Sequence, residues 1–310
     1  MTTSAQTLTK PIRLIVPYAA GGPIDATARI LAERVKDSLG TVIIDNRPGA
    51  GGNIGADAVA KANTDGSVIG IAATATHAVN PWLYKRMPYN AATDFSPVTQ
   101  MLRVPNVLVM NADNAKRLNI HSLQDFLSYA RNNPGKLNYG SGGNGSAAHL
   151  AMEYFKLSTQ TFVVHVPYRG TAPSVSDAVA GQIQMVFTGA PALIPMIKAG
   201  KLRAIAVSSP KRLDSLPDVP TVAESGLKGL DGFEADQWYG LVAPAGTPAA
   251  VVQKLNQVVN ANLAAPEMMT RLKTEGATGT PTSPEAFGQL IQREIKRWRP
   301  VVLNAKITAD

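Results

Sequence analysis

The chain has 310 residues, of which 45% are apolar and 17% charged, with no cysteine and a formal net charge of +8. This composition is that of a globular protein long enough for two domains, and no apolar run reaches the roughly 18 residues of a membrane span. The missing cysteine excludes disulfides, thiolate catalysis and cysteine-ligated metals, and the scattered Lys and Arg residues favour a small acidic ligand over nucleic acid.

The first ten residues contain no apolar stretch, so the sequence as it stands shows no signal peptide. Taken literally, this points to the cytoplasm. An exported protein that had lost its leader and received a new methionine would look the same.

Strand and helix patterns alternate along the first third of the chain. Apolar runs at 12–17, 42–44 and 68–73 predict three strands. Helical spacing of apolar residues predicts a helix over 25–39 and a shorter one over 53–62. The βαβαβ order implies a parallel sheet with right-handed crossovers.

A second alternating series begins near Val107 and continues to about Val207. It predicts strands at 107–110, up to 140, 162–167, 184–188 and 203–207, with helices at 122–132, 146–157, 171–180 and 192–199. A proline-rich stretch at 208–220, a strand at 238–242 and three helices complete the chain.

We therefore expect an α/β fold of two lobes, with parallel-rich sheets flanked by helices and a ligand cleft between the lobes. Lobe 1 combines 12–103 with 226–310, lobe 2 is inserted as 104–225, and 1–11 form an N-terminal extension. The chain is expected to cross between lobes near 100–106 and 224–233.

Two glycine-rich turns each follow a predicted strand and precede a predicted helix. The first contains Ala20, Gly21 and Gly22, and the second spans 140–146, about 120 residues later. Turns without side chains let a ligand touch the backbone, and a helix N-terminus offers unpaired N–H groups and a partial positive charge. Each turn is thus a candidate anion site, and two of them suggest two lobes gripping one small acid.

Two polar residues at the predicted helix starts have roles beside these turns. Asp25 is expected to cap the first helix and to shape its turn. Ser146 is expected to be the N-cap of the helix after the second turn, and its hydroxyl could serve the ligand as well.

The second turn also fits the G-x-G-x-x-G pattern of dinucleotide sites over 140–145. Such sites require an acidic residue about 20 positions later, and none lies between Glu153 and Asp177. Because Arg169 could take a 2′-phosphate, an NADP site stays open as an alternative.

An enzyme with a Ser/His site is a further alternative, since Ser141 and Ser146 lie near His149. No Gly-x-Ser-x-Gly elbow surrounds either serine, and no acid is evident to complete a triad. The other histidines lack metal-ligand spacing and are expected to be ordinary polar residues: His77, His121 and His165.

Several segments, in order along the chain, resemble the substrate-binding proteins of tripartite tricarboxylate transporters, the TctC or Bug type. They are 17–22 with Asp25 and Arg29, 44–52, 139–146 with His149 and Leu150, 166–170, 200–204 and 238–248. The resemblance runs from about residue 12 to 300.

The resemblance implies a two-lobed, type II-like periplasmic binding protein that closes on a small carboxylate and delivers it to a membrane permease, or in some members to a sensor. It implies no enzyme activity, cofactor, metal, nucleic-acid binding or membrane insertion. The ligand would be a mono-, di- or tricarboxylate, an aromatic acid or an amino acid. The protein would be a periplasmic monomer whose signal peptide has been removed.

Carried over from similar proteins, the residues that hold one carboxylate are Tyr18, Ala20, Gly21, Gly22, Ser141, Gly142, Ser146 and His149. The rest of the ligand would meet Thr74, Thr76, His77, Tyr168, Arg169, Thr188, Ala190, Gln237 and Trp238. Segments 22–25 and 237–239 depart from the usual family pattern, so the identity of the ligand is not inherited.

Overall fold

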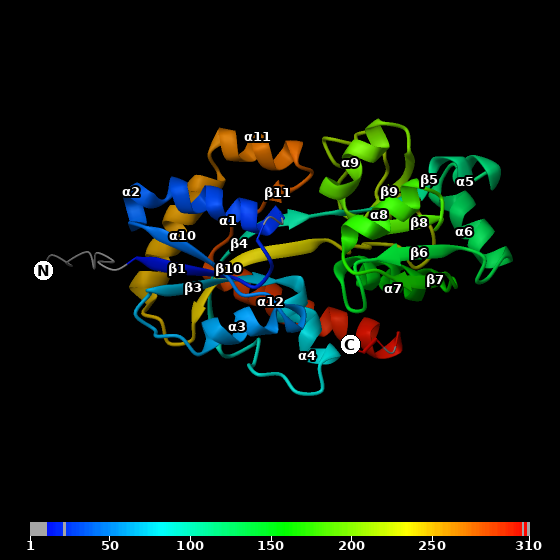
Figure 1. Ribbon diagram of the computed structural model, residues 1–310. Helices are drawn as coiled ribbons and strands as arrows, with labels where there is room; N and C mark the ends of the chain where they lie inside the picture. Colours follow the sequence, from blue (N-terminus) through cyan, green and yellow to red (C-terminus); the bar gives the residue numbers. More distant parts are fainter. Residues whose placement is uncertain (1–10, 21–22, 306, 309–310) are drawn as a thin grey trace, which may run out of the picture. The chain divides into compact units, whose positions relative to one another are not determined.

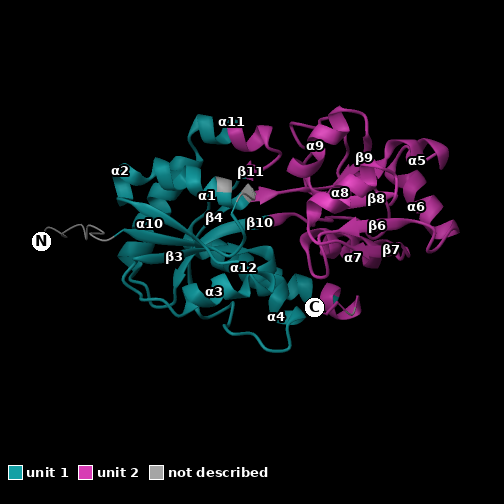
Figure 2. Cartoon of the chain, in the orientation of Figure 1, with its two compact units in different colours: residues 1–102, 238–270, 279–300 teal, residues 103–237, 271–278, 301–310 magenta. Residues whose placement is uncertain are grey.

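Strands and helices alternate through most of the chain, and the strands form two separate sheets (Figure 1). The computed structural model describes residues 11–20, 23–305 and 307–308. They divide into two units, coloured separately in Figure 2. Unit 1 draws on residues up to 102, on 238–270 and on 279–300, and unit 2 on 103–237, 271–278 and the residues from 301.

The βαβαβ segment forms the parallel part of a six-stranded sheet, as predicted. β1 pairs in parallel with β2 and β3, and β10 pairs antiparallel with β3. The strand order is β11-β4-β10-β3-β1-β2. The strands are β1 (Ile12–Val16), β2 (Val42–Asn46), β3 (Val68–Ala73), β4 (Phe95–Val104), β10 (Gln237–Pro244) and β11 (Thr278–Gly279).

The helices that belong wholly or mainly to unit 1 come from both ends of the chain. They are α1 (Pro23–Arg34), α2 (Lys36–Leu39), α3 (Asn53–Ala60), α4 (Asn80–Leu83), α10 (Ala249–Leu263), α11 (Pro266–Thr274) and α12 (Pro284–Asn304), with short turns at η1 (Ala50–Gly52) and η2 (Ala75–Val79).

The single helix predicted over 25–39 was wrong, because α1 ends at Arg34 and α2 begins at Lys36. Val35 between them has φ −89° and ψ −1°, within the right-handed region but with ψ far from that of a regular α-helix. Leu31, Val35 and Leu39 are all buried, so the apolar spacing continues across the break and hides it from sequence analysis.

Unit 2 contains a five-stranded sheet in the order β7-β6-β8-β5-β9. β6 pairs in parallel with β7 and β8, and β5 pairs antiparallel with β8 and β9. The strands are β5 (Asn106–Asn111), β6 (Asn138–Ser141), β7 (Val164–Pro167), β8 (Met185–Gly189) and β9 (Leu202–Val207).

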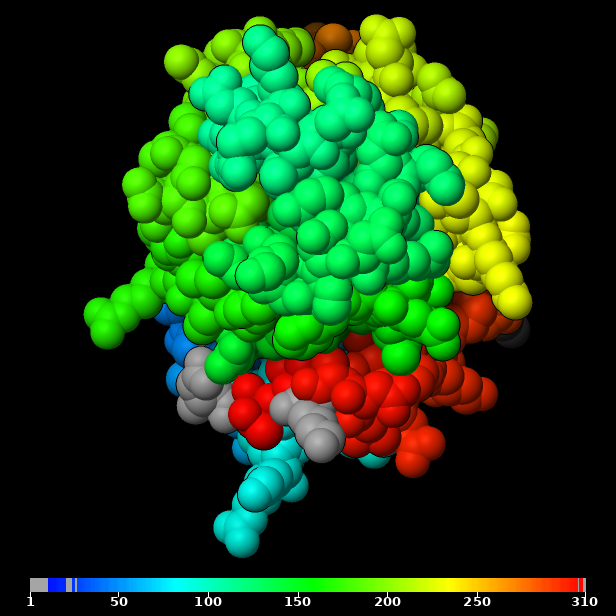
Figure 3. Space-filling model, turned by 90° about the vertical axis from the view of Figure 1, so that its right-hand side faces the viewer, coloured from blue at the N-terminus to red at the C-terminus, as the bar shows by residue number. Residues whose placement is uncertain are grey.

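Both faces of this sheet are covered, and its side chains alternate between two apolar cores. Leu108 and Met110 of β5 join one core, and Val107 and Val109 join the other. The unit 2 helices are α5 (Ala112–Arg117), α6 (Leu123–Asn132), α7 (Ala147–Thr159), α8 (Thr171–Val179) and α9 (Ala190–Lys198), with a turn at η3 (Ala223–Ser225). Figure 3 views unit 2 from the side of α5 and α6, where the blue-green atoms form a convex face.

The segment after β9 stays with unit 2 until Gln237, beyond the crossing expected at 224–233. Leu230, Phe233 and Ala235 are buried in a unit 2 core, and Phe233 stacks on Tyr154 of α7 with ring centroids 4.8 Å apart. This packing ties the segment to unit 2 up to the point where β10 begins.

Candidate functional site

In unit 2, three parallel strands end at one edge of the sheet. β6, β7 and β8 run in the same direction, so the N-termini of α7, α8 and α9 follow at that edge. All the unit 2 residues predicted for ligand binding except Gln237 lie in these strand ends or just after them: Ser141, Gly142, Ser146, His149, Tyr168, Arg169, Thr188 and Ala190.

The second glycine-rich turn leads from β6 to α7. Ser146 caps α7 by accepting a hydrogen bond from the backbone N–H of His149 at 3.4 Å. Gly143 and Gly145 have φ of +115° and +72°, which glycine adopts without strain. A Cβ on Gly142 would lie 3.3 Å from the backbone nitrogen of Thr171, at the start of α8. A side chain at this position would therefore crowd the start of α8.

Ser141 at the end of β6 is fully buried and tied to the turn. Its Oγ accepts from the N–H of Gly143 at 3.1 Å and lies 2.6 Å from Nε2 of His165 on β7. Its hydroxyl is therefore occupied with holding the turn in the described residues.

Tyr168 and Arg169 follow β7 and differ in whether their side chains are available to an anionic ligand. The hydroxyl of Tyr168 donates to Asp177 of α8 at 2.7 Å, and burial together with that carboxylate raises the pKa of Tyr168 to about 12. Arg169 is exposed and pairs with no carboxylate in the described part of the chain. Its guanidinium can therefore receive an anionic group.

Two other predicted unit 2 residues lie at the end of β8. Thr188 and Ala190 are 4% and 0% exposed. The N–H of Ala190 donates to the carbonyl of Pro105 at 2.9 Å. The N-caps of α8 and α9 are Gly170 and Gly189, so no side chain caps either helix.

In unit 1, the carboxyl ends of β1 and β3 also lie at one edge. Tyr18 follows β1 and is half-buried, and Ala20 is exposed. Burial, with smaller contributions from two neighbouring tyrosines, raises the pKa of Tyr18 well above its usual range. Gly21 and Gly22 lie outside the described residues.

Asp25 in the first turn of α1 is 2% exposed and joins three segments. It accepts hydrogen bonds from Arg29 at 3.0 and 3.1 Å and from the side-chain amide of Asn46 at 2.9 Å. The same amide donates to the carbonyl of Tyr18 at 3.1 Å. The exit of β1 is thus tied to the end of β2.

Thr74, Thr76 and His77 follow β3, and each is buried. The Oγ1 of Thr76 lies 2.9 Å from Nδ1 of His77 and accepts from the N–H of Ala73 at 3.1 Å. Burial lowers the pKa of His77 to about 3, so the ring is neutral near pH 7. Its Nε2 has no hydrogen-bond partner among the described residues.

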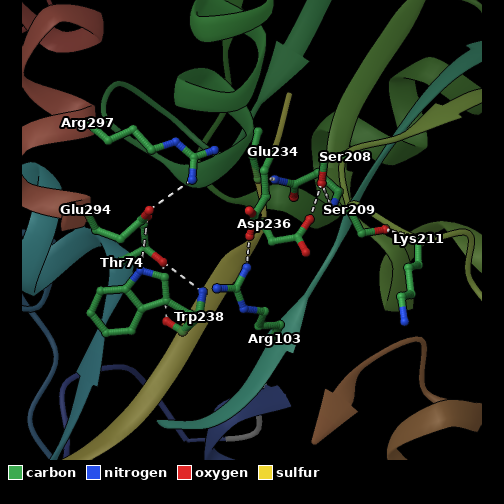
Figure 4. Close-up of polar contacts among 12 residues, drawn as sticks. Thr74, Arg103, Ser208, Ser209, Lys211, Glu234, Asp236, Trp238, Glu294 and Arg297 are labelled. Atoms are coloured by element: carbon green, nitrogen blue, oxygen red, sulfur yellow. Dashed lines mark hydrogen bonds and ion pairs between the residues drawn. The ribbon is translucent and has the colours of Figure 1, made fainter. Parts of the chain in front are cut away.

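Trp238, the second residue of β10, lies beside the end of β3 (Figure 4). Its backbone N–H donates to Oγ1 of Thr74 at 2.8 Å, and its indole N–H donates to buried Glu294 at 3.3 Å. Glu294 also accepts from Trp298 at 3.0 Å and from Arg297 at 2.9 Å. Trp238 is therefore held on both its backbone and its ring.

Gln237, directly before Trp238, is the last residue of the stretch 103–237 of unit 2. Its amide donates to Oδ1 of Asn106 at 3.0 Å. Nearby, Ser208 donates to buried Asp236 at 2.5 Å, and Arg103 pairs with Glu234.

Within the described residues, no cluster of His, Asp and Glu has the geometry of a metal site. None of the described helices is both long and apolar enough to span a membrane.

A family model described as the tripartite tricarboxylate transporter family receptor, TctC, matches residues 27–307. The chain belongs to this family. The family consists of transport receptors that bind solutes, not of enzymes, which disfavours the NADP and Ser/His alternatives.

Three solved structures are similar along nearly the whole chain. A structure titled as that of a periplasmic transporter is 40% identical with a TM-score of 0.82, and 97% of this chain and 99% of that chain are covered. Rpa4515 of R. palustris, solved with adipate, is 38% identical with a TM-score of 0.83 and coverage of 97% and 98%. MatC (Rpa3494) from Rhodopseudomonas palustris, solved with bound malate, is 32% identical with a TM-score of 0.79 and coverage of 95% and 99%. The two-sheet α/β fold of periplasmic binding proteins is thus confirmed.

The structure places one further residue beside the second turn, which the sequence analysis did not select as a site residue. His165, expected to be an ordinary polar residue, contacts Ser141 and lies opposite Tyr139 in the parallel register of β6 and β7. Its spacing from His149 matches no known motif, so only the strand pairing could have indicated it.

Proposed function

We propose that this chain captures a small carboxylate with both glycine-rich turns, one from each unit, and delivers it to a tripartite tricarboxylate-type permease. The observation that carries the proposal is the second turn. There, α8 has Gly170 as its N-cap and therefore no side-chain cap, and its start lies close to Gly142 and beside exposed Arg169. Backbone N–H groups at a helix start and a nearby guanidinium suit a carboxylate.

The ligand class follows from the charge and from the relatives. Because similar proteins were solved with adipate and malate, a dicarboxylate is the first class to test. We propose that one carboxylate meets the two turns and that Arg169 receives the other.

In unit 1, we propose that Tyr18 and Ala20 contact the ligand and that Asp25 shapes the turn. The support is the hydrogen-bond network from Asp25 through Asn46 to the carbonyl of Tyr18. Thr74, Thr76, His77 and Trp238 are buried, and we infer that they stabilise the carboxyl ends of β1 and β3.

Calorimetry with adipate, monomethyl adipate and dimethyl adipate tests the proposal. Adipate should bind, the monoester should bind more weakly, and the diester should not bind, because an ester lacks the charge that the N–H groups and Arg169 receive. Equal binding of adipate and the diester would refute a carboxylate site.

We place the protein in the periplasm, as a monomer that meets its permease there. The periplasmic relative and the receptor family support this location. Fractionation of cells that express the native gene, light scattering of the purified protein, and its capture by the permease subunits in detergent would test these three points.

A further inference from the structure

Two stacked imidazoles lie beneath the second glycine-rich turn of unit 2. The rings of His149 on α7 and His165 on β7 are 3.9 Å apart between centroids, with 13° between their planes. Tyr139 of β6 also lies nearly parallel to His165, with ring centroids 4.9 Å apart. His149 is 6% exposed, so its ring is enclosed by the unit.

The ring of His149 is hydrogen-bonded to the turn through one particular nitrogen. Its Nδ1 accepts from the backbone N–H of Gly145 at 3.1 Å. Because a backbone N–H can only donate, Nδ1 carries a lone pair and the ring proton lies on Nε2. Gly145 is itself buried and in the left-handed region, directly before Ser146. His149 thus fixes the end of the turn at the point where α7 begins.

The charged and titratable groups packed against the pair come from three elements. On α7, Oε1 of Glu153 lies 3.9 Å from Nε2 of His149 and accepts from Nζ of Lys156 at 2.5 Å. On β6, the hydroxyl of Tyr139 donates to the same carboxylate oxygen at 2.6 Å. β7 contributes His165. Glu153 is therefore shared between a lysine and a tyrosine beside the imidazole.

We propose that His149 is a positioning residue: its neutral Nδ1 holds Gly145, and with it the second glycine-rich turn, in the shape that receives the carboxylate. The inference deepens the proposed function and rests on it for the effect on ligand affinity. Protonation of Nδ1 would remove the acceptor, so the hydrogen bond to the Gly145 N–H forms only when the ring is neutral.

The surroundings of the ring disfavour its protonation and so favour the hydrogen bond to Gly145. Burial, the neighbouring His165 and the charge of Lys156 lower the pKa of His149 to about 3. The ring of His149 is therefore neutral, and able to accept from the Gly145 N–H, near neutral pH. Without Lys156, Glu153 would face Nε2 with no cation beside it, and the pKa of His149 would rise.

Two substitutions at one position separate hydrogen bonding from packing. In His149→Asn, the side-chain oxygen takes the place of Nδ1 as acceptor, whereas His149→Phe keeps the aromatic stack without an acceptor. We expect His149→Phe to lose about tenfold or more in adipate affinity, because a buried N–H is left unpaired. His149→Asn should recover most of that loss. The matched control is His121→Asn, at an exposed histidine bonded to Asn119.

Amide exchange and histidine ¹⁵N spectra test the same point without a ligand. The Gly145 amide should be protected in wild type and in His149→Asn and should exchange faster in His149→Phe. The ¹⁵N shifts should show the Nε2–H tautomer of His149. Equal protection of Gly145 in all three proteins, or the Nδ1–H tautomer, would overturn the inference. If adipate fails to bind wild type, the proposed function fails for this probe while these spectra still decide the inference.

A pH series on Lys156→Met completes the test. In wild type, adipate affinity should fall only as adipate itself is protonated. In Lys156→Met the fall should begin at higher pH, and adding His149→Asn should return it to the wild-type profile. Identical profiles for wild type and Lys156→Met would contradict the protective role of Lys156.

Discussion

At the scale of residues, the glycines of the second turn meet different neighbours. A Cβ on Gly140 would lie 2.5 Å from Cδ1 of Ile183 and 3.0 Å from Cβ of Ser174, inside the unit. A Cβ on Gly142 would meet the backbone of α8 instead. Gly140 therefore serves packing, and Gly142 keeps the turn close to a helix start.

Ser146 combines a structural role with the proposed binding role, and a second serine separates them. Ser122 caps α6 in the same way, within a capping box completed by Asp125. Ser146→Ala and Ser122→Ala should each lower the free energy of unfolding by about 0.5–2 kcal/mol. Only Ser146→Ala should also weaken adipate binding. Urea denaturation and calorimetry on both variants measure this, and an equal affinity change in the two would argue against a ligand contact at Ser146.

The buried histidines make stability depend on pH. His77 and His149 have folded pKa values of about 3, below the ordinary value of 6.5. The unfolded chain therefore binds protons near pH 6 that the folded chain does not, and stability is lost as pH falls below 6.5. Each histidine contributes a slope of up to about 1.4 kcal/mol per pH unit.

Urea denaturation at pH 7, 6 and 5 should show this decline in the free energy of unfolding. His149→Asn should reduce the slope, and His121→Asn, at the exposed site, should leave it unchanged. A free energy of unfolding that is constant from pH 7 to 5 would mean that these rings are protonated in the folded state.

At the scale of elements, the link between β1, β2 and α1 is expected to govern the first turn. Asn46→Ala removes the amide that bonds the carbonyl of Tyr18 and the carboxylate of Asp25. We expect about 1–3 kcal/mol lower stability, because buried polar atoms lose partners, and weaker adipate binding.

Lys61→Ala is the control for Asn46→Ala, since it removes an exposed pair with Asp57 on α3. Its effect on stability should stay within about 0.5 kcal/mol, with no change in affinity. Denaturation and calorimetry compare the two, and unchanged adipate binding by Asn46→Ala would exclude a role for this link in the first turn.

The spacing of apolar residues and the alternating order of strands and helices predicted most elements, and each element that was missed has a physical cause. β3 was predicted with its observed bounds, since its six residues are apolar and nearly all buried. β4 was missed because Pro97 interrupts it and because Thr99 and Gln100 are buried although polar. Asn260 and Thr282, distant in sequence, accept hydrogen bonds from the hydroxyl of Thr99 and from the backbone N–H of Gln100.

The candidate site likewise has residues that the sequence could predict and residues that it could not. The βα pattern places Tyr168 and Thr188 at or just after strand ends, and the family resemblance made them candidate ligand contacts. The stack of His149 on His165 depends on how β7 pairs with β6, which no local pattern encodes. The assignment of site residues itself stays a prediction until a ligand is bound.

At the scale of the whole molecule, the chain passes between the units after residues 102, 237, 270, 278 and 300. Binding proteins of two units commonly close by rotation about such connections. Small-angle scattering should therefore give a smaller radius of gyration with saturating adipate than without ligand. Dimethyl adipate should leave the radius unchanged. The same radius with and without adipate, in a protein that binds it by calorimetry, would rule out closure.

The position of β10 in the unit 1 sheet constrains the order of folding. It lies between β4 and β3, yet it follows both by more than a hundred residues of chain. Until residue 244 has been synthesised, β3 and β4 have no common neighbour and each presents an unpaired edge. The continuous stretch 103–237 precedes it and already contains the five-stranded sheet of unit 2. A nascent chain halted near residue 237 would thus carry all five strands of the unit 2 sheet but one set of exposed strand edges in unit 1, a substrate for chaperones during biogenesis.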